Sequence, residues 1–183
     1  MIIKLLKRRE DWSFKMKRFI VYFLEIFILF TIQSSMFQFA ELAGVIPNLM
    51  IILVVSTAYM EGRTSGLLVG FFSGLLSDIM FGSVIGLYAL IYMLIGYLVG
   101  YANKIYSNDD FTLPIIFTGL ATFLYRFIYY IFEFLLRGKL NFLYYFRRFI
   151  VPEIIYTLVI SVFLYKILHM INNWLNHMDN KEA

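Results

Sequence analysis

Residues 62–86, GRTSGLLVGFFSGLLSDIMFGSVIG, decide how this chain folds. Glycine recurs at four-residue steps, and most side chains between the glycines are apolar. Positions four apart lie nearly one above another on an α-helix, so these glycines form one slowly winding stripe. In a bilayer, such a stripe lets a second helix backbone approach closely. The stripe comprises Gly62, Gly66, Gly70, Gly74, Gly82 and Gly86, with Asp78 at the remaining step.

The stripe has two interpretations. It packs against another helix of the same chain, or it forms a face for a partner or for a second copy in a homodimer. A helix with this many glycines would be unfavourable in a soluble protein, because each Gly in a helix costs about 1 kcal/mol relative to Ala.

The composition is that of a polytopic membrane protein. Of the 183 residues, 61% are hydrophobic and 15% are charged, and the apolar residues fall in several long stretches. The length suits one compact helical bundle without a separate soluble domain. The chain has no Cys, which excludes disulfides and thiolate chemistry.

We expect an all-α integral membrane protein with six transmembrane helices in one bundle. The basic segment 1–18 is expected to lie on the membrane surface, 19–172 to form the transmembrane domain, and 173–183 to form a tail. The second and third helices are short, so a re-entrant hairpin is the alternative for this pair. The expected helices cover about residues 19–40, 47–60, 62–80, 83–102, 112–136 and 149–171.

The distribution of basic residues predicts that both termini are cytoplasmic. Seven of the sixteen Lys and Arg residues lie in the first eighteen positions, which places that end inside. The segment 137–148 departs from the rule that basic residues gather in the cytoplasmic loops. It carries four basic residues, yet it follows the fifth helix and is therefore expected outside. The aromatic and apolar middle of this segment, Leu140 to Phe146, predicts a short amphipathic turn in the membrane interface.

Catalytic and metal-binding patterns are missing from the sequence. His169 and His177 are expected at or beyond the end of the last helix, in a surface or helix-end role. Ser73-Gly74 is similar to the GxSG of intramembrane serine proteases, but Phe71 replaces the first glycine and no His is available as a base. We therefore expect no enzymatic activity, metal or cofactor.

Polar groups within the apolar segments are the remaining candidates for function, because they are costly in lipid. Arg126, Glu133 and Glu153 are expected either to form a buried ion pair or to line a polar path into the bundle. Arg126 is expected to point into the bundle, with Glu133 or Glu153 as its partner. The alternatives for Asp78 are a cap on the fourth helix and a functional carboxylate.

The segments PNLMIILVV, residues 47–55, and GLLVGFFSGLLSDIMFGSVIGLYALIYMLIGYLVGY, residues 66–101, resemble the MreD family of rod-shape-determining membrane proteins. The chain departs from the family at Val84-Ile85, where a Pro is common. Pro47 and Asn48 are expected to begin the second helix. The matching positions are Pro47, Asn48, Leu49, Gly66, Gly70, Gly74, Asp78, Gly82, Gly86, Leu87, Leu90, Gly96 and Tyr97.

The resemblance implies a fold akin to the substrate-binding subunits of energy-coupling-factor transporters. It implies a non-enzymatic scaffold in a bacterial cell membrane, which directs lateral peptidoglycan synthesis and does not bind nucleic acid. The implied direct partner is MreC, a single-span protein with its coiled coil and β-domain outside. MreB, RodA and its penicillin-binding transpeptidase are the implied further members of the complex.

The alternative function is a membrane subunit that binds or transports a small molecule or a lipid-linked precursor. A transport subunit should carry an Ala-xxx-Ala docking face on its first helix. The segment Phe19 to Phe39 contains no alanine, which weighs against this alternative.

Overall fold

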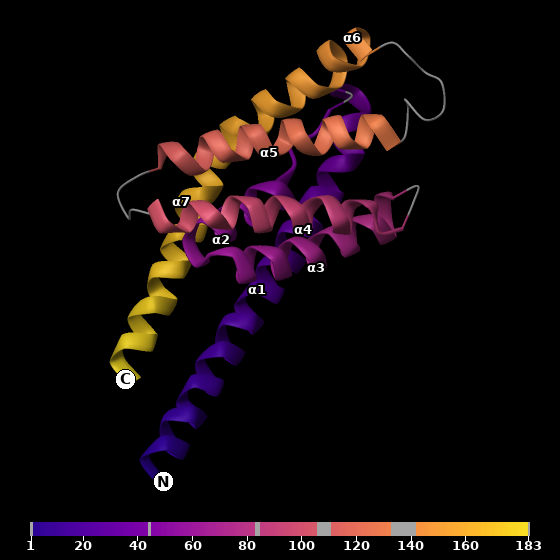
Figure 1. Cartoon of the computed structure of the whole chain (residues 1–183). Helices are drawn as coiled ribbons and strands as arrows, with labels where there is room; N and C mark the ends of the chain where they lie inside the picture. The colour runs from indigo at the N-terminus through magenta and orange to yellow at the C-terminus, as the bar shows by residue number, and fades with distance from the viewer. Residues whose placement is uncertain (1, 44, 83–84, 106–110, 133–141, 183) are drawn as a thin grey trace.

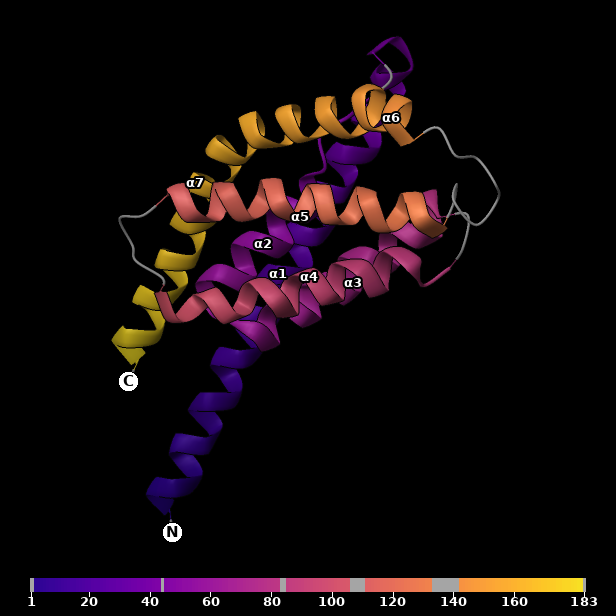
Figure 2. The same cartoon turned by 45° about the horizontal axis from the view of Figure 1, so that its top comes forward.

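The computed structural model describes residues 2–43, 45–82, 85–105, 111–132 and 142–182. All the regular secondary structure in this part of the chain is helical. Figure 1 shows α5 lying between α7 and the α3–α4 pair, and Figure 2 shows the same order. The elements are α1 (Ile2–Ala43), α2 (Leu49–Glu61), α3 (Arg63–Phe81), α4 (Leu87–Val99), the 3₁₀ helix η1 (Gly100–Ile105), α5 (Thr112–Tyr130), α6 (Phe142–Tyr145), the π-helix η3 (Phe146–Ile150) and α7 (Val151–Glu182).

The all-helical prediction is confirmed for the described residues, whereas the six-span bundle is not confirmed. Four helical segments are long and apolar enough to cross a membrane: Met16–Met36, Arg63–Phe81, Thr112–Tyr130 and Phe142–Met178. The expected second and fourth helices form as α2 and α4, but each has 13 residues. Such a helix is about 20 Å long, which is shorter than a hydrocarbon core of about 30 Å.

The short helix α2 is the centre of the bundle. Every residue from Leu49 to Tyr59 is buried, on all sides of the helix. A helix that is apolar all round requires a fully apolar environment. Here α1, α3, α4, α5 and α7 supply it, since each of them contacts α2.

Glycine brings the backbones of α3 and α4 into direct contact. A Cβ atom added at Gly70 would lie 2.3 Å from the carbonyl oxygen of Tyr92, and one at Gly74 would lie 2.5 Å from the Cα of Ala89. One added at Gly96 would lie 2.0 Å from the carbonyl oxygen of Gly66. No side chain fits at these positions, so in the structure the stripe packs within the chain.

The remaining stripe glycines serve the turns. Gly62 joins α2 directly to α3 with a φ of 92°, and Gly86 precedes α4 with a φ of 100°. This left-handed region is open to glycine at little cost. A Cβ at Gly82 would instead lie 2.6 Å from the carbonyl oxygen of Asp78, at the end of α3.

Both terminal helices are longer than the sequence predicts. α1 begins at Ile2 instead of residue 19, and α7 continues to Glu182 instead of ending near 171. Figure 1 shows both helices crossing the others steeply, with the N-terminus of α1 and the C-terminus of α7 on the same side of the bundle. Residues 2–18 thus continue the first helix, and their position on a membrane surface stays a prediction.

The prediction of a short turn over residues 140–146 is wrong for its described part, residues 142–146, whereas the position of this segment in the membrane interface stays a prediction. These residues are helical in α6 and η3 and run on into α7. Tyr145 is buried, and its ring centroid lies 5.1 Å from that of Tyr130 on α5. Aromatic packing against α5 therefore holds this segment in the bundle. Residues 137–141 lie outside the described part.

The α3–α4 contact makes a direct prediction for glycine substitutions. Gly70→Ala should lower the midpoint of thermal unfolding in detergent, and Gly70→Leu should lower the yield of folded protein further. The added atoms must separate two backbones, and overpacking costs about 1–3 kcal/mol.

Gly119→Ala on α5 is the matched control. Its Cβ would meet the end of the flexible Leu158 side chain at 3.2 Å instead of a backbone. The gain in helix propensity should leave this variant neutral or more stable. Equal stability of the Gly70→Ala and Gly119→Ala variants would contradict close backbone packing.

Candidate functional site

The first N–H groups of α2 are paired inside the bundle. Asn48 is the N-cap residue, and its side-chain oxygen accepts a hydrogen bond of 3.0 Å from the Ile51 N–H. Gln33 on α1 accepts hydrogen bonds from the N–H groups of Leu49 at 2.8 Å and Met50 at 3.2 Å. Two side chains thus accept hydrogen bonds from the free N–H groups at the start of α2. This pairing allows the helix to begin away from water.

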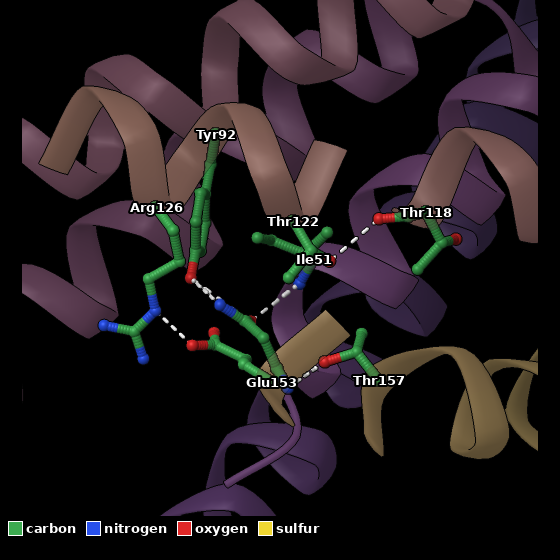
Figure 3. Close-up of polar contacts among 8 residues, drawn as sticks. Ile51, Tyr92, Thr118, Thr122, Arg126, Glu153 and Thr157 are labelled. Atoms are coloured by element: carbon green, nitrogen blue, oxygen red, sulfur yellow. Dashed lines mark hydrogen bonds and ion pairs between the residues drawn. The ribbon is translucent and has the colours of Figure 1, made fainter. Parts of the chain in front are cut away.

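Asn48 also connects α2 to α4 and α7. Its side-chain nitrogen donates to the Tyr92 hydroxyl at 2.8 Å, and its backbone N–H donates to the Thr157 hydroxyl at 3.1 Å. Figure 3 draws these hydrogen bonds to Tyr92, which lies on α4, and to Thr157, which lies on α7. The expectation that Pro47 is the first helical residue is wrong, since the Asn48 cap moves the helix start to Leu49.

Asp78 caps the start of α4. Its two carboxylate oxygens accept hydrogen bonds of 2.9 Å from the N–H groups of Tyr88 and Ala89. This confirms the capping interpretation of Asp78, and an anion at a helix N-terminus is favoured by the helix dipole. The cap and the left-handed Gly86 also explain why α4 begins at Leu87 and not near residue 83 as predicted.

Arg126 on α5 and Glu153 on α7 form a buried ion pair. The Arg126 Nε donates to a carboxylate oxygen of Glu153, whose residue is 1% exposed. The two side chains point toward each other beside Tyr92 (Figure 3). Pairing offsets the cost of these charges, which would otherwise be roughly 2.5–3.5 kcal/mol for an unpaired Arg at mid-membrane. The other candidate partner, Glu133, lies outside the described residues.

Four tyrosines surround the ion pair. Tyr88 and Tyr92 lie one turn apart on α4, and Tyr125 and Tyr129 lie one turn apart on α5. The ring centroid of Tyr88 is 5.6 Å from that of Tyr125 and 5.5 Å from that of Tyr129. The Arg126 guanidinium carbon lies 5.3 Å from the Tyr125 ring centroid, which adds a cation–π contact.

These groups enclose a partly open cavity of about 250 Å³ near the α3–α4 turn and the start of α7. Its wall combines hydroxyl, amide and charged groups with aromatic rings, which is typical of a site that orients a bound group. The lining residues are Gln33, Ile46, Pro47, Asn48, Ser77, Phe81, Tyr88, Tyr92, Tyr125, Arg126, Tyr129 and Glu153.

Within the described residues, no group of three His, Cys, Asp or Glu side chains could hold a metal ion. The prediction of a surface or helix-end role for His169 is wrong, because α7 continues past it. The residue is buried, with its ring 5.9 Å from that of Tyr165 and Nε2 2.9 Å from the Asn173 amide nitrogen.

The structure brings Asn48, Arg126 and Glu153 together at one cavity, and it assigns Asp78 and the glycines to helix packing and turns. Sequence reasoning did not select Gln33 or the tyrosines. Gln33 carried a signal, since it is a polar side chain within the long apolar stretch of the first helix.

The ion pair predicts non-additive effects of substitution. Arg126→Leu or Glu153→Leu alone should lower the free energy of unfolding by about 3–5 kcal/mol, because each leaves one buried charge unpaired. The double variant should recover most of that loss. Lys166→Leu, at an exposed position on α7, is the control and should have little effect. Additive losses in thermal unfolding would show that the two side chains do not act as a pair.

A comparison with family models identifies one match over most of the chain. The model for rod shape-determining protein MreD matches residues 15–175. No curated protein and no solved structure matches the chain. The likeness to energy-coupling-factor subunits therefore stays a prediction. The residues that carry the capped starts of α2 and α4, the glycine stripe and the cavity all lie within the matched region, and the chain belongs to the MreD family of rod shape-determining proteins.

Proposed function

We propose that this protein is a non-enzymatic scaffold of the bacterial rod complex that binds MreC and helps direct lateral peptidoglycan synthesis. Membership of the MreD family supports a role in rod shape determination. MreB, RodA and its penicillin-binding transpeptidase are the further members of the proposed complex. In this proposal the chain crosses the membrane several times with both termini in the cytoplasm, as its basic residues predict.

The observation that carries the proposal is the cavity beside the α3–α4 turn. In the orientation that the basic residues predict, this end of the bundle faces outside. The soluble part of MreC lies on the same side, so the MreC segment directly above its membrane span would meet the cavity. The aromatic rings offer contact area, and Arg126, Asn48 and the tyrosine hydroxyls offer hydrogen bonds.

The rigidity of the site favours a scaffold. The cavity wall is fixed by the caps on α2 and α4, by the ion pair between α5 and α7, and by backbone packing of α3 on α4. A preorganised surface loses little conformational entropy when a partner binds. The wall therefore suits a stable protein contact.

A small-molecule subunit is the second candidate, and the volume of the cavity is the observation that favours it. A space of about 250 Å³ is near the small end of ligand pockets, which hold about 300–1,000 Å³. Purification followed by mass spectrometry of the extracted small molecules tests this candidate. A stoichiometric ligand that is lost from a cavity variant would favour it over the scaffold.

The scaffold proposal predicts that cavity side chains control MreC binding. Tyr129→Ala should lower the amount of MreC that co-purifies with the tagged protein by about tenfold, since truncating an aromatic anchor in an interface commonly costs 1–2 kcal/mol or more. Cells that rely on this variant should lose their rod shape.

Tyr156→Ala is the matched control. Tyr156 is the same residue type, lies on α7 and is 47% exposed outside the cavity. It should retain MreC at the normal level. Full MreC recovery with a folded Tyr129→Ala protein would contradict the cavity contact, and loss with Tyr156→Ala alone would assign MreC to the lipid-facing surface.

A further inference from the structure

A small polar cavity lies between α1, α2 and α7, at the opposite end of α2 from the tyrosine cavity. Its volume is about 10 Å³, which is close to the space that one water molecule needs. Three apolar side chains form part of its wall. The polar side chains that line it are Tyr22 and Glu25 on α1, Thr57 and Glu61 on α2, and Asn172 on α7.

Asn172 brings an unpaired hydrogen-bond acceptor to this cavity. The residue is 6% exposed, and its side-chain oxygen has no hydrogen-bond partner among the described residues. The buried hydroxyl of Tyr22 likewise lacks a partner in the described part of the chain. A buried polar atom that stays unpaired destabilises the fold. Because an amide oxygen only accepts, the group that satisfies Asn172 is a hydrogen-bond donor or a cation.

Glu25 brings a carboxylate without a positive partner. It lies within the apolar part of α1 that is long enough to cross a membrane, Met16–Met36. No ion pair joins it to another residue that the structure describes. Carboxylates at such positions are rare and are usually paired with a positive charge.

The neighbouring cation is already engaged by other groups. Arg18 forms an ion pair with Glu61 and donates a hydrogen bond of 2.6 Å to the side-chain oxygen of Asn176. Glu61 and Arg18 therefore compensate each other, and the negative charge of Glu25 remains. The cavity also lies beside the last turn of α2, where the helix dipole favours a positive charge.

We propose that this cavity binds one sodium ion and thereby joins α1, α2 and α7. Glu25 supplies the negative charge, and the Asn172 side-chain oxygen supplies a neutral ligand. The hydroxyl oxygens of Tyr22 and Thr57 complete the set. Carboxylate, amide and hydroxyl oxygens are ligands that hard cations prefer.

Charge and size together select a sodium ion. A single water molecule has two hydrogens to donate, and it would leave the charge of Glu25 uncompensated. A divalent cation would exceed the one negative charge that remains. Ca²⁺ also takes six to eight oxygen ligands and Mg²⁺ keeps several waters, so neither fits a space of about one water molecule. K⁺ is larger than Na⁺ and is disfavoured by the same small volume.

The sequence predicted no metal site, because these ligands lie far apart in the chain and meet only in the folded bundle. The site is also independent of the tyrosine cavity, which lies at the other end of α2. Its failure would leave the proposed function unaffected.

Thermal unfolding of the purified full chain in detergent at pH 8 tests the site, with NaCl replacing choline chloride at constant ionic strength. About 100 mM Na⁺ should raise the midpoint by about 5 °C, the shift expected for a ligand at about a hundred times its Kd. The same concentration of K⁺ should have much less effect. Equilibrium dialysis with radioactive sodium should give one bound ion per chain.

Glu25→Gln and Asn172→Ala should each abolish the response to sodium. In choline chloride, Glu25→Gln should be more stable than the unchanged protein, because no buried charge is then left without a partner. Asn173→Ala is the matched control, since Asn173 is the next residue on α7 but contacts His169 and does not line the cavity. It should respond to sodium like the unchanged protein.

Three results would overturn the proposal. The first is equal stabilisation by Na⁺ and K⁺, which would be a general effect of salt. The second is a full sodium response in either Glu25→Gln or Asn172→Ala. The third is a protein that binds no sodium and gains stability only as the pH is lowered, because Glu25 would then carry a proton in place of the ion.

Discussion

A helix that begins inside an apolar bundle needs partners for its first N–H groups, and this constraint at Asn48 shapes the rest of the structure. An unpaired amide in a dry environment costs several kcal/mol. Gln33 from α1 and the Asn48 side chain together accept from the first three N–H groups of α2. Tyr92 from α4 and Thr157 from α7 in turn hold Asn48 in place. The pairing of one helix start therefore fixes four helices relative to one another.

The polar groups that satisfy this constraint also create the cavity. α2 has only 13 residues and begins at Leu49. The longer helices continue past this start, which leaves space between them. Arg126 and Glu153 meet in that space, and the tyrosines of α4 and α5 complete the wall. The Asp78 cap near the end of α3 and the glycine contact along α3 hold α4 against α3. The site is thus built from the same interactions that stabilise the fold.

The sequence predicted the helical class, the order of the helices and the use of Asp78 as a cap, because each depends on local spacing. Glycine at four-residue steps identifies a close-packing helix wherever its partner lies. The pattern could not show that α4 is that partner, nor could it reveal that α2 is fully buried.

The misplaced helix ends have physical causes that the spacing of residues does not encode. The start of α4 at Leu87 depends on a left-handed Gly86, and the helical segment 142–148 depends on packing of Tyr145 against Tyr130. The tyrosine wall depends on two helices meeting in space. Residue spacing within one helix does not encode such a contact between distant segments.

We propose that the tyrosine cavity receives a segment of MreC. Photo-crosslinking in living cells tests it most directly, with a photoreactive phenylalanine analogue placed at Tyr129 inside the cavity or at Phe163, which is 70% exposed on α7. We expect the analogue at position 129 to capture MreC through residues just outside the membrane span of MreC. Capture at position 163 without capture at position 129, from proteins present at equal levels, would contradict it.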